Sequence, residues 1–92
     1  IITEIIEEMT DNLDSYEVLI EMHFKNGNFQ EVVNLYNYLE SNNIKTFRAL
    51  TIEFVAISYV NLKDFTRGCS LALTLKNYNY KVSQGLESIC NI

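Results

Sequence analysis

The sequence contains no proline and only three glycines among its 92 residues. These two residue types interrupt helices and build the tight turns between strands, so their scarcity argues against a sheet with many turns. Hydrophobic residues make up 48% of the chain, which is enough to bury a core. We therefore expect an all-α fold.

Cysteine is scarce as well, with Cys69 and Cys90 as the only two. Neither belongs to a CxxC motif or to a histidine-linked spacing that would bind zinc, and two cysteines do not make a disulfide framework. We expect both to be reduced packing residues of an intracellular protein. The chain has no apolar run of about 18 residues, so we also expect no membrane-spanning segment.

The motifs on which enzymes depend are missing. Gly27, Gly68 and Gly85 are isolated, so no glycine-rich loop can hold a phosphate. His23 is the single histidine, and no recognisable motif places a nucleophile beside it, so we expect it to pack partly buried. The acids of residues 7–11 lack the loop spacing of oxygen ligands for a metal. We expect no enzyme, no metal site, no cofactor and no small-molecule substrate.

Positive charge is scarce in the first half of the chain. Residues 1–47 carry nine acids against two lysines, a net charge of −7, whereas residues 48–92 carry five cations against three acids, a net charge of +2. Proteins that bind nucleic acids usually present a basic surface. Only the second half could supply such a surface, and weakly.

A pattern that returns after 36 residues is the main positive signal. When residues 16–47 are placed above residues 52–83, aromatic and aliphatic residues coincide, with Phe29 on Phe65. We expect those two phenylalanines to have equivalent surroundings. A fixed period of this size is typical of stacked helical repeats, so the expected architecture is an α-solenoid of antiparallel helical hairpins.

The chain holds two full repeats in this interpretation, at about residues 13–47 and 49–83. Partial helices flank them at residues 1–11 and 84–92. Because the chain begins and ends on apolar residues, we expect it to be a segment of a longer protein. A single hairpin cannot bury its own apolar face, so such a segment needs neighbours.

Each repeat divides into two helical patterns joined by a short break. Apolar residues at helical spacing predict four helices, at residues 15–25, 29–40, 47–62 and 65–77. Gly27 supplies the left-handed conformation with which the first helix stops. Gly68 lies where the two helices of the second hairpin should come closest, and Val32 is its counterpart in the first.

Short motifs of the repeats match one known family. Residues 16–20 stand where that family has Tyr-x-x-Leu-Ile, and residues 25–27 match its Lys-x-Gly turn. Residues 31–39 are similar to its Glu-Ala-x-x-Leu-Phe-x-x-Met, and residues 43–47 and 79–83 occupy the place of its Gly-Ile-x-Pro-Asp tail. The chain thus resembles the pentatricopeptide repeat family. The tetratricopeptide repeat, with a unit of about 34 residues, is the alternative.

The resemblance covers about residues 13–83 and has departures. Thr46 and Val82 stand where the family has proline, Lys63 replaces the glycine of the turn, and the linker is one residue longer. These departures leave the tetratricopeptide alternative open. The tail that follows each second helix is what favours the pentatricopeptide family.

Proteins of the pentatricopeptide family bind single-stranded RNA in mitochondria or chloroplasts, and each repeat reads one nucleotide with two side chains. The resemblance implies six RNA-contacting residues, namely the base-reading pairs Glu17 with Phe47 and Glu53 with Ser83, and the phosphate contacts Lys25 and Asn61. Glutamate accepts hydrogen bonds but repels phosphate, so we favour the interpretation of Glu17 and Glu53 as ordinary acids near a helix N-terminus. We likewise favour the interpretation of Phe47 as a packing residue at the start of the second repeat.

Two functions follow as expectations. The first is binding of single-stranded organellar RNA, suspected to be mitochondrial, in transcript processing, stability or translation. The alternative is a tetratricopeptide-like scaffold for protein–protein interaction. The acidic first half and the off-pattern glutamates motivate that alternative.

Overall fold

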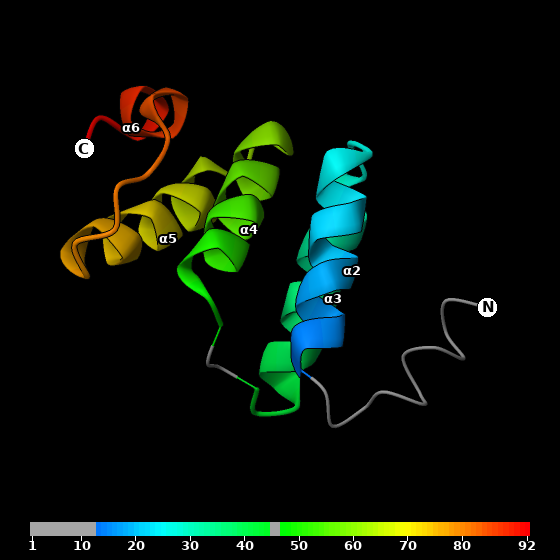
Figure 1. The fold of residues 1–92 in the computed structure, drawn as a ribbon. Coiled ribbons are helices and arrows are strands. Elements are labelled where there is room, and N and C mark those ends of the chain that lie inside the picture. Colours follow the sequence, from blue (N-terminus) through cyan, green and yellow to red (C-terminus); the bar gives the residue numbers. More distant parts are fainter. Residues whose placement is uncertain (1–12, 45–46) are drawn as a thin grey trace.

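The computed structural model describes residues 13–44 and 47–92, and every regular element within them is an α-helix. The helices are α2 (Leu13–Lys25), α3 (Phe29–Ser41), α4 (Ala49–Asn61), α5 (Phe65–Asn77) and α6 (Gln84–Cys90). Helix α3 runs back along α2, and α5 runs back from the end of α4 (Figure 1). The all-α class is confirmed, while the helix expected at residues 1–11 lies outside the described residues.

Helix boundaries agree with the predicted ones to within two residues. The first begins two residues early, at Leu13, and α4 begins two residues late, at Ala49. Arg48 is the residue before α4 and has an extended backbone, with φ −64° and ψ 148°. None of the helices in the described part of the chain has the length and hydropathy needed to cross a bilayer.

Helices α2 to α5 end in the same kind of turn. The second residue past the end of each helix adopts a left-handed backbone, and its N–H and the N–H of the next residue donate to the last carbonyls of the helix. The left-handed residues are Gly27 (φ 74°), Asn43 (65°), Lys63 (69°) and Asn79 (64°). Gly27 and Lys63 are 36 residues apart, as are Asn43 and Asn79, so the backbone repeats with the spacing of the sequence pattern.

Two clusters of buried side chains form the core, and α4 contributes to both. The first cluster joins α2, α3 and α4 and contains Tyr16, Ile20, Val32, Val33, Tyr36, Leu39, Val55 and Tyr59. The second joins α4, α5 and the segment that ends in α6, and contains Ala56, Val60, Ala72, Leu75, Val82 and Leu86. Helix α4 is therefore covered on two sides, which explains why its sequence is the most apolar of the helices.

Gly68 marks a close approach of α4 and α5, as the sequence predicted. A Cβ atom at this position would lie 2.7 Å from Cγ2 of Val60 and 2.9 Å from the carbonyl oxygen of Ala56. Both distances are too short for real contacts. Val32, the counterpart of Gly68, is fully buried with its side chain between the helices of the first cluster.

Phe29 and Phe65 open α3 and α5 in the same way, but their surroundings differ. The ring of Phe29 is half-buried and meets Phe24 edge-on at 6.0 Å, whereas Phe65 is 47% exposed. Val60 stands at the position of Phe24 in the second hairpin, and it is directed at Gly68 instead. The expectation of equivalent surroundings is therefore wrong, although both residues begin the second helix of a hairpin.

The two cysteines form a disulfide, so the expectation of two reduced thiols is wrong. Cys69 in α5 and Cys90 at the end of α6 have Cα atoms 5.3 Å apart. Their 21-residue separation hides this proximity, because the chain turns after α5 and brings α6 back against it. Cys69 lies 36 residues after Val33, and α6 begins 35 residues after α4, which places Cys90 at the position of Val55. The disulfide thus lies at the positions that correspond to Val33 and Val55, two buried residues of the first cluster.

Candidate binding site

Glu17 is buried between α2 and the start of α4, with 2% of its surface exposed. One carboxylate oxygen accepts the backbone N–H of Arg48 at 2.8 Å and the hydroxyl of Thr51 at 2.7 Å. The other oxygen accepts Nε–H of Arg48 at 3.0 Å. Burial of a carboxylate is costly unless donors satisfy it, and here three donors do so. Glu17 thereby caps the N-terminus of α4, where negative charge is favoured.

Glu53 makes the same kind of contact 36 residues later. It is 9% exposed, accepts the backbone N–H of Ser83 at 2.7 Å, and accepts the hydroxyl of Tyr80 at 3.1 Å. Ser83 precedes α6 as Arg48 precedes α4. We call these two contacts the glutamate clasps. Each joins the first helix of one hairpin to the N-terminus of the helix that follows the hairpin.

The clasps could have been anticipated from one signal. Glu53 is the only charged residue in the apolar sequence of α4, and it returns at the 36-residue spacing of Glu17. A recurring acid on an otherwise buried helix indicates an internal partner. Burial, followed by the hydrogen bond to Glu53, raises the pKa of Tyr80, which keeps its hydroxyl a donor in the second clasp.

The remaining residues implied by the family resemblance lie apart from the clasps. Phe47 is half-buried, with its ring centroid 5.3 Å from that of Tyr36, so it packs on the core. Lys25 is exposed and its Nζ lies 2.7 Å from Glu21. Asn61 is exposed, and its side-chain amide donates to the backbone of α4 at 2.9 Å. Lys25 and Asn61 belong to different hairpins.

Each implied base-reading pair is nevertheless close in space. Glu53 contacts Ser83 through the backbone of Ser83, and Glu17 contacts the residue that follows Phe47. The side chain of Ser83 is exposed, and both glutamates are turned inward. The two carboxylates thus accept their hydrogen bonds from residues of this chain.

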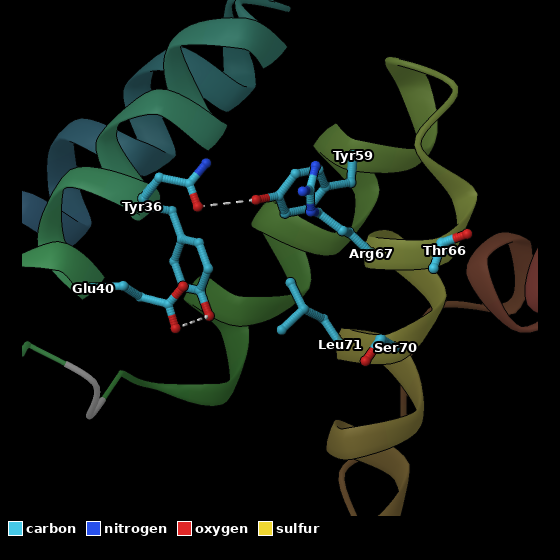
Figure 2. A pocket seen from close by; sticks show the side chains of 8 residues that line it. Tyr36, Glu40, Tyr59, Thr66, Arg67, Ser70 and Leu71 are labelled. Carbon is cyan, nitrogen blue, oxygen red and sulfur yellow. Dashed lines mark hydrogen bonds between the residues drawn. The ribbon is translucent and has the colours of Figure 1, made fainter.

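A groove of about 310 Å³ lies between α3 and α5 and has α4 as its floor (Figure 2). Helix α3 contributes Tyr36, Asn37 and Glu40, α4 contributes Tyr59, and α5 contributes Thr66, Arg67, Ser70 and Leu71. The side chains of Tyr36 and Tyr59 are only 7% and 6% exposed. Their hydroxyl ends nevertheless reach the groove, which the apolar spacing of the helices could not indicate.

Hydrogen bonds hold the floor and one wall of the groove. The hydroxyl of Tyr59 donates to Oδ1 of Asn37, and that of Tyr36 donates to Oε2 of Glu40, both at 3.3 Å (Figure 2). Burial, together with the neighbouring Glu40 carboxylate, raises the pKa of Tyr36 to about 12. Tyr36 therefore stays protonated and donates to Glu40 at any physiological pH.

The charges on the two walls have opposite sign. Glu40 on α3 is half-buried, and no cation among the described residues forms an ion pair with it. Arg67 on α5 is exposed and lies 2.9 Å from Asp64, which precedes that helix. The groove thus offers a guanidinium on one wall and, on the other, a carboxylate without an ion pair among the described residues.

Neither a metal-ligand cluster nor an unsatisfied buried polar side chain occurs among the described residues. Residues 13–44 and 47–92 contain no group of three histidine, cysteine or acidic side chains arranged to hold a metal ion. Every buried side-chain nitrogen and oxygen in this region has a hydrogen-bond partner. Polar groups that remain available to a ligand are therefore at the surface and in the groove.

No family model, curated protein or solved structure matches this chain.

Proposed function

We propose that this chain is a stretch of an α-solenoid of helical hairpins that serves as a scaffold for a protein partner. The glutamate clasps and the helix-ending turns support this architecture. The two glutamates and the left-handed residues recur after 36 residues, and the residues that the glutamates bind, Arg48 and Ser83, recur after 35. In a solenoid each unit contacts only its neighbours, so one contact between units is repeated along the array. The glutamate clasps are contacts of this kind, because each one joins a hairpin to the helix that follows it.

The single observation that favours a protein partner over RNA is the engagement of Glu17 and Glu53. A code of one base per repeat needs side chains that hydrogen-bond to an exposed base edge. Both carboxylates are buried and already accept donors of this chain. Residues 1–47 also carry a net charge of −7, which repels phosphate.

Single-stranded RNA, in the mitochondrial role implied by the pentatricopeptide resemblance, is the second candidate. The observation in its favour is a set of exposed cations in the second half of the chain, namely Arg48, Lys63, Arg67, Lys76 and Lys81. Cations of this kind supply the affinity of a protein for nucleic acid irrespective of sequence. Ser83 and Lys25 would remain available to a nucleotide under this interpretation.

Titration with a fluorescently labelled single-stranded RNA of mixed sequence distinguishes the two candidates. We expect no saturable change in anisotropy at low salt, where electrostatic binding is strongest. Single-stranded DNA of the same length is the control for non-specific attraction. Saturable RNA binding that weakens steeply with added salt and is reduced by Lys76→Gln and Lys81→Gln would replace the protein scaffold by the RNA candidate.

A further inference from the structure

We propose that the groove between α3 and α5 binds an extended peptide segment of a partner protein, with a lysine or arginine of that peptide paired to Glu40. The inference rests on the proposed scaffold function and names the surface and the chemistry of the partner. Three features of the groove carry it: the unpaired acid, the polar groups along the walls, and the size of the hollow.

The acid is the first feature. The Glu40 carboxylate is half-buried, and its hydrogen bond to the Tyr36 hydroxyl, at 3.3 Å, leaves Oε1 without a donor among the described residues. Tyr36 is itself held in the core, so it fixes the position of the carboxylate. A pre-positioned, partly desolvated carboxylate pairs strongly with a cation, because little entropy is lost and the hydrogen bond is charge-assisted.

Polar groups along the walls are the second feature. Asn37 uses Oδ1 for Tyr59, which leaves its amide hydrogens to donate. Thr66 and Ser70 are exposed on the opposite wall, and their hydroxyls make no hydrogen bond to other described residues. Amides and hydroxyls of this kind match the alternating N–H and C=O groups of an extended peptide backbone. Half-buried Leu71 adds an apolar contact for a neighbouring side chain.

Size and charge suit a peptide segment. A groove of about 310 Å³ holds a few side chains. A nucleic acid would bring phosphate towards Glu40. Arg67 stands on the other wall, so an acidic residue or carbonyl of the peptide would lie on that side, and the peptide would bind in one direction (Figure 2).

The test begins with a random-peptide library displayed on phage and selected against the whole chain at physiological salt. We expect the selected peptides to share a lysine or arginine beside an apolar residue. For one such peptide, labelled and titrated by anisotropy, Glu40→Gln should raise Kd about tenfold or more, the scale of one charge-assisted hydrogen bond. Glu31→Gln is the matched control, since Glu31 is an exposed acid on the same helix outside the groove.

A charge exchange makes the assignment specific to the groove. Glu40→Lys should abolish binding of the selected peptide, and a peptide with its basic residue changed to glutamate should bind the Glu40→Lys protein. Circular dichroism spectra that match the parent exclude misfolding as the cause. The proposal is overturned if no peptide is enriched, or if Glu40→Gln and Glu31→Gln have the same effect. Peptides that bind independently of Glu40 would contradict the groove as the peptide-binding site but would agree with the scaffold function. Saturable RNA binding would contradict the scaffold function itself.

Discussion

The carboxylate of Glu17 lies 2.8 Å from the backbone nitrogen of Arg48, across the junction between the first hairpin and the second. The junction between α4 and α6 repeats this relationship with Glu53 and Ser83. In both cases an acid near the start of the first helix of a hairpin binds at the start of the helix that follows the hairpin. Four predictions follow from this contact and from three other features of the fold.

Glu17→Ala should lower the free energy of unfolding by about 2–3 kcal/mol, because it leaves the buried hydroxyl of Thr51 and the N–H of Arg48 without their acceptor. Urea denaturation at neutral pH measures this difference. Glu31→Ala is the control, because Glu31 is exposed on α3, and it should change stability by no more than about 0.5 kcal/mol. Equal stability of the two variants would show that the first clasp contributes nothing.

Gly68→Ala should destabilise the protein by about 1–3 kcal/mol, since the added Cβ meets Val60 and the backbone of Ala56 in a packed interface. Gly85→Ala is the matched substitution, because nothing lies within 4 Å of the atom it adds. Alanine is the better helix former, so Gly85→Ala should raise stability by up to about 1 kcal/mol. Thermal unfolding followed by circular dichroism compares them. A Gly68→Ala protein as stable as the Gly85→Ala protein would contradict the close approach of α4 and α5.

Reduction of the Cys69–Cys90 disulfide should lower stability by about 3 kcal/mol, the value typical of a loop of this length. Urea denaturation with and without a dithiol measures the loss. Before reduction we expect no reaction with a thiol reagent in the unfolded protein, and after reduction two thiols per chain, because the sequence contains two cysteines. Two reactive thiols in the untreated, unfolded protein would contradict the disulfide.

Tyr36 should make stability fall as pH rises from about 10 to about 12. Its pKa is raised by burial from 10.0 to about 12 in the folded protein, so over this range the unfolded chain loses the proton first. The unfolded state then binds fewer protons than the folded state, and the free energy of unfolding decreases with pH. The contribution is fully present below pH 10 and lost above about 12.

Urea denaturation at several alkaline pH values measures this slope, with Tyr36→Phe as the variant and Tyr38→Phe as the control. Tyr38 is 53% exposed on the same helix. The slope should be shallower in the Tyr36→Phe protein alone. If both variants retain the slope of the parent, Tyr36 is not the group responsible.

The helices were predictable because local rules determine them. Helix α5 has the bounds expected from apolar spacing, and α2 ends where Gly27 adopts its left-handed conformation. The start of α4 was expected at Phe47 and lies at Ala49. Arg48 is held in an extended conformation while its N–H donates to Glu17, a residue 31 positions away, so propensity alone could not locate this boundary.

The site was less predictable than the fold, for the same reason. Tyr36 and Tyr59 have buried rings, as residues at the apolar spacing of a helix do. Their hydroxyl groups reach partners on other turns and another helix, and the resulting groove depends on how far apart α3 and α5 lie. The prediction of reduced thiols at Cys69 and Cys90 was wrong for the same reason, because their pairing depends on where α6 lies against α5.

The glutamate clasps also determine where such a protein can be divided. A fragment that stops at residue 44 would keep Glu17 but lose Arg48 and Thr51. The Glu17 carboxylate would then be without the donors that satisfy it in the full chain. A fragment extended through the first turn of α4 retains both donors. Fragments for crystallisation or for binding assays should thus end one helical turn into the following unit, since the natural seam of the chain lies inside a helix and not in the linker before it.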